Sequence, residues 1–297
     1  MLTGFHTVFI GGDARQLEVI KKCSELDATI TLIGFNRLQN EYSGATKADM
    51  DSEALESADA LILPIVGTNA DGVVESIFSE KTIVLKEKHI QHLPKHCVIY
   101  TGMANDYLLG LTSPSNIKVV QLLERNDVAI YNSIPTVEGA IMMAIQNTDI
   151  TIHDADVIVL GLGRTGMSVA RAFAALGARV SVGAREKEHL ARIYEMGLIP
   201  FHINELSKHV HHCDILLNTI PAPIVKAEIL SRMPPHTFIL DLASHPGGTD
   251  FRFAQKRGIK AILAPSLPGI VAPKTAGKII AGVVTELLSD QHLSGRE

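Results

Sequence analysis

Three glycines in the stretch GLGRTG have the types and spacing that suit a nucleotide pyrophosphate. An apolar segment, Asp156–Leu160, precedes them, and a helical pattern and a second β-rich segment, Arg179–Gly183, follow. In this context Gly161 permits a tight turn, Gly163 lets backbone amides approach the phosphates, and Gly166 lets the helix pack closely on the strand. A ligand-free βα turn is the alternative. The cofactor-binding residues expected here are Gly161, Gly163, Arg164, Thr165 and Gly166.

The end of the second β-rich segment indicates which dinucleotide binds. An NAD site places a carboxylate there to accept from the ribose 2′-hydroxyl, but this chain has Ala184 and Arg185. A guanidinium can pair with a 2′-phosphate, which a carboxylate would repel. The sequence therefore favours NADP, with Arg185 as the phosphate reader and a solvated surface arginine as the alternative.

Two loops after later strands are expected to border the nicotinamide, in a cleft between domains. The loops LNTIPAP and LDLASHPGGTDF contain prolines and glycines that fix loop shape. His245, in the second loop, could move a proton, although a lone loop histidine is more often simply exposed to solvent. The contact candidates are Thr219, Ile220, Pro221, Ala243 and Ser244.

A second strand–glycine–helix start, TVFIGGDARQ, differs from the first where a phosphate would bind. Gly11 and Gly12 allow a sharp turn, but no third glycine follows, and Asp13 brings negative charge. This turn can still present Asp13 and Arg15 at the carboxyl end of a sheet, where open α/β folds bind ligands. We expect a substrate-binding domain here; the alternative is an Asp cap beside a solvated arginine.

Two further segments supply candidate substrate contacts. In NSIPTVEGAI, Ser133 or Thr136 can cap a helix whose first turn contains Pro135, and both hydroxyls could donate to a substrate. In LPGIVAPKTAG, Lys274 precedes a helix and could hold a carboxylate, or lie free in solvent.

The cluster SKHVHHCD invites a metal site. His209, His212 and Cys213 have helical spacing, but the cluster ends directly in a buried strand and no second ligand group accompanies it. An exposed helix end is favoured, and no metal is expected.

The elements that must position these residues alternate between strands and helices, as in βαβ units. The expected fold is α/β, with two doubly wound parallel-sheet, Rossmann-like domains joined by a connecting helix. The expected strands are His6–Ile10, Thr29–Gly34, Ala58–Pro64, Thr82–Leu85, Cys97–Thr101, Val128–Tyr131, Asp156–Leu160, Arg179–Gly183, Ile215–Asn218, Phe238–Leu242 and Lys260–Leu263. The expected parts are a substrate domain (1–132), the connecting helix (133–150), an NADP-binding domain (151–273) and a C-terminal helix (274–297) that packs back on the first domain or the junction.

Composition limits the other classes. The 297 residues are 46% apolar and 20% charged, enough for two buried cores. A formal charge of −5 without a basic stripe disfavours nucleic acid as a partner. Three widely spaced cysteines, no basic leader and no run of about 18 apolar residues predict a cytoplasmic chain without a membrane span.

With these residues in view, the chain resembles the A subunit of bacterial dipicolinate synthases. The segments GGDARQ, YNSIPTVEGAI, GLGRTG, DLASHPGGTDF and LPGIVAPKTAG follow that family's order over nearly the whole chain. The arrangement is distantly similar to D-2-hydroxyacid dehydrogenases and S-adenosylhomocysteine hydrolases, but the arginine, glutamate and histidine set of the hydroxyacid enzymes is not recognisable.

The resemblance implies oxidation of a dihydrodipicolinate-type intermediate of the lysine pathway to pyridine-2,6-dicarboxylate during sporulation, in the mother cell. It also implies a flavoprotein-like partner, the B subunit of dipicolinate synthase. A dianionic substrate needs two anion sites, for which Arg15 and Lys274 are the candidates, and a homo-oligomer is expected. The alternatives are an NADP-dependent hydroxyacid or imine oxidoreductase, and a non-catalytic NADP-sensing subunit.

Overall fold

The structure is a computed structural model that describes residues 1–51, 53–264 and 266–294. The chain forms two compact units. The N-terminal unit combines Met1–Ala129 with Ala272–Glu297, and the central unit is Ile130–Val271. Each unit is built on its own sheet, so each is described by itself.

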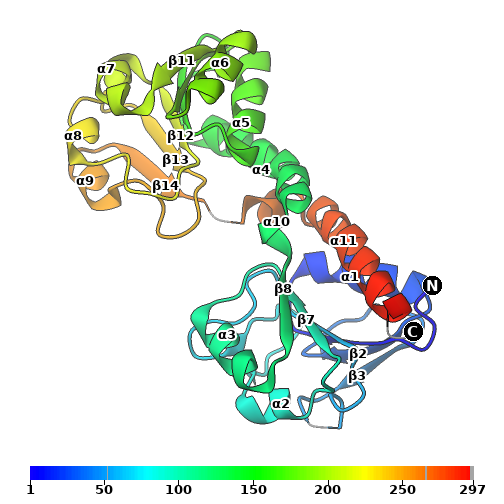
Figure 1. Cartoon of the computed structure of the whole chain (residues 1–297). Coiled ribbons are helices and arrows are strands. Elements are labelled where there is room, and N and C mark those ends of the chain that lie inside the picture. The colour runs from blue at the N-terminus through cyan, green and yellow to red at the C-terminus, as the bar shows by residue number, and fades with distance from the viewer. Residues whose placement is uncertain (52, 265, 295–297) are drawn as a thin grey trace. The chain divides into compact units, whose positions relative to one another are not determined.

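The N-terminal unit contains a six-stranded parallel sheet in the order β3-β2-β1-β4-β7-β8. From β1 the sheet is built outward on one side through β2 and β3, and on the other side through β4, β7 and β8. The topological switch point therefore lies between β1 and β4. Helices α1 and α11 contribute to the core on one face, and α2 and α3 to the core on the other (Figure 1). The strands are β1 His6–Ile10, β2 Thr29–Ile33, β3 Ala45–Ala48, β4 Ala60–Ile62, β7 Val98–Thr101 and β8 Lys118–Gln121, with β5 Val73–Val74 and β6 Ile83–Val84 in a separate antiparallel pair. The helices are α1 Ala14–Glu25, α2 Glu87–Gln91, α3 Asp106–Thr112 and α11 Pro273–Ser294, with 3₁₀ turns η1 Ser113–Ser115 and η2 Leu122–Glu124.

The central unit repeats this plan with the order β11-β10-β9-β12-β13-β14, again all parallel. Strand β9 reads DVIVL and is almost wholly buried, as expected for a central parallel strand covered on both faces. The strands are β9 Asp156–Leu160, β10 Arg179–Ala184, β11 Ile199–His202, β12 Ile215–Asn218, β13 Phe238–Asp241 and β14 Lys260–Leu263. The helices are α4 Asn126–Asn147, α5 Arg164–Ala175, α6 Lys187–Glu195, α7 Leu206–His209, α8 Ala227–Leu230, α9 Phe251–Lys256 and α10 Leu267–Val271, with 3₁₀ turns η3 Ile203–Glu205 and η4 Val210–His212. The doubly wound fold expected from the sequence is confirmed in both units.

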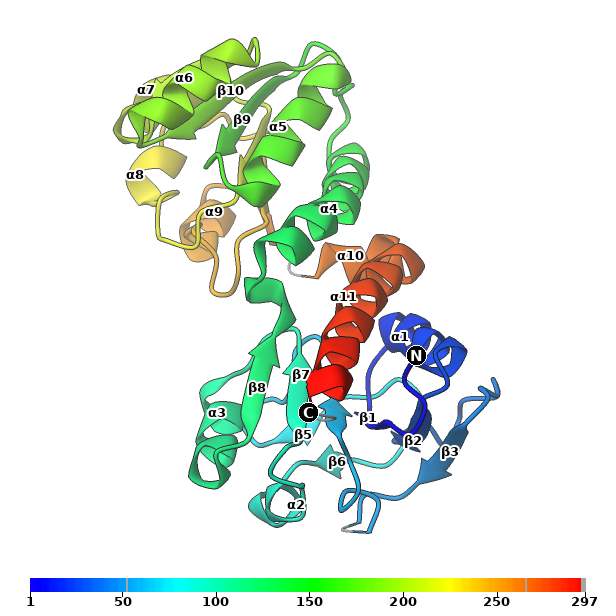
Figure 2. The ribbon, with the colours of Figure 1, turned by 45° about the vertical axis from the view of Figure 1, so that its right-hand side comes forward.

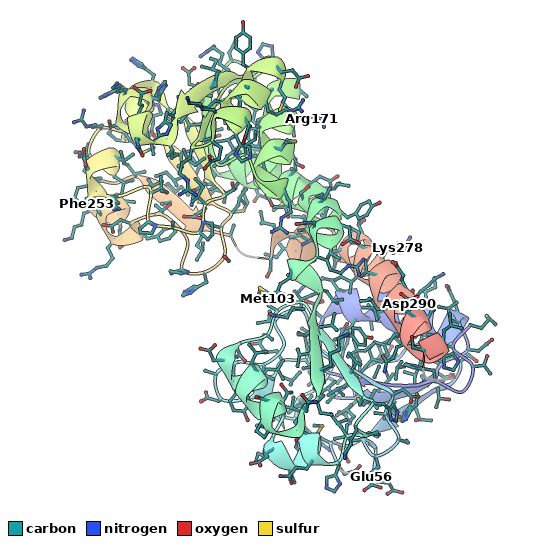
Figure 3. All side chains as sticks on the ribbon, viewed as in Figure 1. Glu56, Met103, Arg171, Phe253, Lys278 and Asp290 are labelled. Carbon is teal, nitrogen blue, oxygen red and sulfur yellow. The ribbon has the colours of Figure 1, made fainter. Side chains whose placement is uncertain are left out.

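Helix α11 completes the N-terminal unit by packing on α1. Gly277 permits the close crossing, because a Cβ there would lie 2.7 Å from the backbone oxygen of Arg15. Val284 and Leu288 of α11 share a core with Val19 and other buried residues of α1. The opposite side of α11 carries exposed charge, including the Lys278 and Asp290 labelled in Figure 3.

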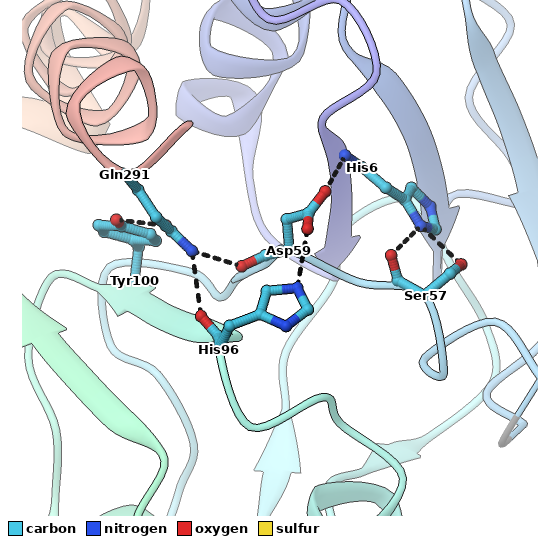
Figure 4. A network of polar contacts seen from close by, with 6 residues as sticks. All are labelled: His6, Ser57, Asp59, His96, Tyr100 and Gln291. Atoms are coloured by element: carbon cyan, nitrogen blue, oxygen red, sulfur yellow. Dashed lines mark hydrogen bonds and ion pairs between the residues drawn. The ribbon is translucent and has the colours of Figure 1, made fainter. Parts of the chain in front are cut away.

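A polar network holds the end of α11 against the sheet (Figure 4). The Gln291 side chain donates to the carbonyl oxygens of Asp59 (2.8 Å) and His96 (3.2 Å), and accepts from the Tyr100 hydroxyl (3.0 Å). The Asp59 carboxylate accepts from the backbone N–H of His6 (2.7 Å) and pairs with the His96 ring (2.9 Å). Residues far apart in sequence are thereby fixed at the amino-terminal edge of β1, β4 and β7.

One expected strand was wrong, and another is present but pairs outside the six-stranded sheet. The strand expected at 128–131 is part of α4, which begins at Asn126 and contains Pro135 in its interior. A proline there removes one helical hydrogen bond but does not end this helix. The strand expected at 82–85 contributes only to the β5–β6 pair, while the short or half-exposed β3, β8 and β11 were missed.

Among the described helices, α4 is the one long and apolar enough to satisfy the criteria for a membrane span. Its most apolar window has a mean hydropathy of 1.3, and 39% of that window is buried. Val137, Ala140 and Ala144 of α4 belong to the core of the central unit. A helix that packs against a protein core is apolar for that reason, and it passes the same test of length and hydropathy.

Candidate functional site

The GLGRTG turn joins β9 to α5, and its three glycines have different surroundings. Gly161 has φ +94°, and a Cβ there would lie 2.7 Å from the Thr219 hydroxyl oxygen. At Gly166 a Cβ would lie 2.1 Å from the backbone oxygen of Gly161, so any side chain would push helix and strand apart. At Gly163, the N-cap of α5, φ is −80° and a Cβ would meet no atom within 4 Å. The protein itself therefore requires glycine at 161 and 166 but not at 163.

The first turn of α5 fits a bound pyrophosphate. Within the described residues, no side chain accepts a hydrogen bond at its N-cap, and Gly163 is exposed. The backbone N–H groups in the first turn of a 12-residue helix, with the helix dipole behind them, favour an anion. The open space at Gly163 is what a ligand drawn close to the backbone would fill, so these residues suit a nicotinamide dinucleotide.

Ala184 ends β10 and Arg185 follows it, at the strand end where the ribose is read. Ala184 is buried, whereas Arg185 is exposed and forms no ion pair with any other residue that the structure describes. Arg185 is thus available to a phosphate.

A buried polar pair that the sequence reasoning did not single out fixes the two candidate loops after β12 and β13. Asn218 and Asp241 are both fully buried at the ends of these strands, and the Asn218 amide donates to the Asp241 carboxylate at 2.9 Å. The carboxylate also accepts from the backbone N–H groups of Ala243 (3.2 Å) and Gly248 (2.8 Å) and from the Thr249 hydroxyl (2.7 Å).

The Asn218 side chain likewise holds the loop that follows β12. Its side chain accepts from the Ile220 N–H (3.1 Å) and donates to the Ile220 oxygen (3.1 Å), while the Thr219 hydroxyl donates to Leu160 O (2.7 Å) beside the glycine turn. The expected contact residues Thr219 and Ile220 therefore do lie against Gly161.

The remaining loop candidates occupy different environments. Ala243 is buried, whereas Pro221, Ser244 and His245 are exposed. His245 makes no hydrogen bond within the described residues, so nothing in the central unit orients it as an acid or base.

In the N-terminal unit, Asp13 occupies the place that phosphate would need. Its carboxylate caps α1 by accepting from the Arg15 N–H (2.9 Å), and it pairs with the Arg15 guanidinium through Nε (3.0 and 3.1 Å) and Nη2 (2.6 Å). Burial alone would raise the pKa of Asp13, but the hydrogen bonds and charge of Arg15 outweigh it and hold this pKa below its ordinary value. The Asp cap expected as the alternative is present, but Arg15 is 9% exposed rather than solvated.

A cavity of about 170 Å³ lies beside this ion pair, at the switch point between β1 and β4. Open α/β sheets bind their ligands at such a point. The cavity is lined by Gly12, Asp13, Arg15, residues 64–69, Val73 and residues 75–77.

The other candidate substrate residues divide between the two units. Lys274 is exposed in the first turn of α11, one turn before Gly277 meets the Arg15 backbone. Ser133 and Thr136 are inside α4, not at its start, so the expected capping role was wrong. Their hydroxyls donate to the carbonyl oxygens of Ile130 (2.7 Å) and Asn132 (2.8 Å), and Ser133 also contacts the Ser168 hydroxyl at 2.8 Å.

His209, His212 and Cys213 border one cavity, but the side chains of His209 and Cys213 are otherwise engaged. The His209 ring stacks on Phe201 with centroids 4.2 Å apart, and burial raises the pKa of the Cys213 thiol. Within the described part of the chain, no group of three or more histidine, cysteine, aspartate or glutamate side chains is arranged to hold a metal ion.

The fold and the glycine turn define a protein with the two-unit, NAD(P)-binding architecture of dehydrogenases. Residues 132–293 match the alanine dehydrogenase/PNT C-terminal domain, and residues 6–123 match the N-terminal domain of the dipicolinate synthase A subunit. The chain belongs to the family of dipicolinate synthase A subunits.

The relatives support this assignment along the whole chain. The dipicolinate synthase A subunit of Bacillus subtilis (strain 168) is 57% identical over 290 residues, 98% of each chain, and the crystal structure of the Bacillus subtilis A chain gives a TM-score of 0.95 at 56% identity over 99% of each chain. The crystal structure of the Bacillus halodurans A subunit gives 0.92 at 59% identity, covering 97% of this chain and 99% of that one. Apo D-lactate dehydrogenase from Escherichia coli, at 12% identity, a TM-score of 0.64 and 97% of each chain, shares the fold alone.

Proposed function

We propose that this chain is the NADP-dependent subunit of dipicolinate synthase and oxidises a dihydrodipicolinate-type intermediate to pyridine-2,6-dicarboxylate. The observation that carries the proposal is the α5 turn, where Gly163 faces open space and the helix has no side-chain cap among the described residues. Family membership supplies the substrate class, because the relatives are named for dipicolinate synthesis.

The central unit binds and orients the dinucleotide. Backbone amides after Gly163 bind the pyrophosphate, and Arg185 pairs with the 2′-phosphate. Thr219 and Ile220 border the glycine turn, and the Asn218–Asp241 pair keeps both loops in place. NADP⁺, when bound, supplies the hydride acceptor.

The N-terminal unit binds the dicarboxylate. Arg15 is held in one orientation by Asp13, which neutralises part of its charge, so a second cation is needed for a dianion. Lys274 is that cation, on the helix that crosses α1 at Arg15. Orientation and charge are the protein's main contributions, because aromatisation of the ring provides much of the driving force.

The reaction is balanced without another oxidant. One ring C–H bond gives its hydride to NADP⁺, a second ring position loses a proton to solvent, and the products are dipicolinate, NADPH and H⁺. The proposed partner is the flavoprotein-like B subunit of dipicolinate synthase, and the proposed setting is the cytoplasm of the mother cell of a sporulating bacterium.

The test is anaerobic absorbance at the reduced-nicotinamide band. Freshly generated dihydrodipicolinate is mixed with NADP⁺ and this chain, with and without the flavoprotein-like partner, and dipicolinate is quantified separately. Equal amounts of dipicolinate and NADPH above the uncatalysed control are expected. If NADP binds but neither product forms even with the partner, the chain is a nucleotide sensor or acts on another substrate.

A further inference from the structure

A second cavity in the N-terminal unit lies at the carboxyl ends of β2 and β3, apart from the switch-point cavity. The two cavities share no lining residue. Strand β3, strand β6 and helix α2, which contribute to its walls or lie next to them, are labelled in the lower part of Figure 2. Its volume is about 280 Å³, and a water molecule takes roughly 30 Å³ of liquid, so a small organic molecule fits. The lining residues are Ile33, Gly34, Asn36, residues 48–50, Ser79, residues 81–84, Lys86, Lys88 and His89.

The charge of this cavity is unbalanced. Lys81, Lys86 and Lys88 line it, and Asp49 is the one carboxylate among the lining residues. The Lys81 ammonium pairs with Asp49 at 2.8 Å. Lys86 and Lys88 form no ion pair with any residue between 1 and 294 that the structure describes, so two positive charges face the cavity region without compensation.

A buried histidine adds a directed donor. His89 is 5% exposed, and its Nδ1 accepts a hydrogen bond from the Lys86 backbone N–H at 3.0 Å. Burial and the charges of Lys88, Lys86 and His92 lower the pKa of His89, so the ring is neutral at pH 7. The proton is therefore on Nε2, which has no hydrogen-bond partner within the described residues.

We propose that this cavity, the lysine pocket, binds a small organic phosphate ester. The two lysines that form no ion pair among the described residues match the charge of roughly −2 on a phosphate monoester, toward which a lysine ammonium acts as a point charge. The apolar side chains of Ile33, Met50 and Ile83 line the same space and suit the organic part of the ester.

The experiment titrates the full chain with ribose 5-phosphate, inorganic phosphate and dipicolinate. The Gly163→Val background is used to keep phosphates out of the α5 turn. Binding is measured by calorimetry and located by ¹⁵N NMR of the histidine ring nitrogens. Saturable binding of ribose 5-phosphate with a shift of the His89 Nε2 signal is expected, and inorganic phosphate and dipicolinate should bind at least tenfold more weakly.

Variants separate ligand binding from folding. Lys86→Gln with Lys88→Gln should weaken ribose 5-phosphate at least tenfold, while the exposed Lys95→Gln outside the pocket should change it less than twofold. His89→Asn can keep an acceptor for the Lys86 N–H but removes the Nε2 donor, so binding should weaken while the melting temperature is retained.

No saturable binding, equal binding by the lysine variants, or a His89 Nε2 signal that dipicolinate shifts at a lower concentration than ribose 5-phosphate would each overturn the proposal. Dipicolinate binding that leaves the His89 signal unchanged belongs to the substrate site at Arg15 and is subtracted with the Arg15→Met variant. None of these outcomes touches the nicotinamide proposal, since the assay contains no dinucleotide.

Discussion

Replacement of Gly163 by valine should separate nucleotide binding from folding. The residue has φ −80°, and a Cβ would meet no atom within 4 Å, so neither backbone strain nor a clash opposes the substitution. Valine is a poorer N-cap than glycine, which should cost about 1 kcal/mol of unfolding free energy. In the complex, the side chain would occupy the space through which the pyrophosphate reaches the backbone.

The loss of affinity follows from the hydrogen bonds that would be prevented. Two backbone N–H bonds to a charged phosphate are worth about 1.5–3 kcal/mol each, which together is roughly 100- to 20,000-fold in dissociation constant. NADPH fluorescence titration measures this affinity, and urea denaturation measures stability. Gly166→Ala is the matched control, because its Cβ would lie 2.1 Å from Gly161 O and should destabilise the unit itself. NADPH binding by Gly163→Val within threefold of wild type would refute this account of the turn.

The remaining predictions concern one residue each. Arg185→Asp should weaken NADP far more than NAD in the same titration, with the exposed Lys187→Asp as control; equal weakening of both would remove Arg185 as the phosphate reader. Asp241→Asn should cost about 3 kcal/mol in urea denaturation, because buried donors lose their acceptor, and a cost below about 1 kcal/mol would contradict the role of this network. Arg15→Met should raise the apparent KM for the dicarboxylate and leave NADP affinity unchanged, and unaltered substrate kinetics would exclude it from the substrate site. Because the pKa of Asp13 is lowered in the folded state, its carboxylate stabilises the fold above the ordinary value of 3.8, and this contribution is lost as the pH falls through the lowered pKa. The advantage of wild type over Asp13→Asn in unfolding free energy should therefore be present at about pH 7 and shrink as the pH falls below 3.8.

The inner strands of the central unit were predictable because they are buried on both faces and read as continuous apolar runs. Strands β9 and β12 have the expected bounds, as has the less buried β14, and the glycine turn has its expected place. The misses occurred where an apolar run is lacking or belongs to a helix. The half-exposed β3 reads ATKA, which has no apolar run, and the β-branched Val128 and Ile130 belong to a helix because the pattern of α4 continues through them.

The candidate site was predictable only where a local turn or helix start accepts a single type of residue. The glycines at 161 and 166 are in that class, as is Asp13 at the start of α1. The Asn218–Asp241 pair depends on two strands about 20 residues apart becoming neighbours, and the lysine pocket depends on the return of residues 81–89 to the ends of β2 and β3. Such contacts are set by tertiary structure and have no local sequence pattern.

The division of the chain has a consequence for its synthesis on the ribosome. The central unit is contiguous, so it can fold as soon as residue 271 has emerged. The N-terminal unit is started first but lacks α11, so the face of α1 that contains Val19 stays uncovered until residues 273–294 arrive. The part that begins first is therefore completed last, and the apolar face of α1 is open to aggregation during the interval in which the central unit is being made.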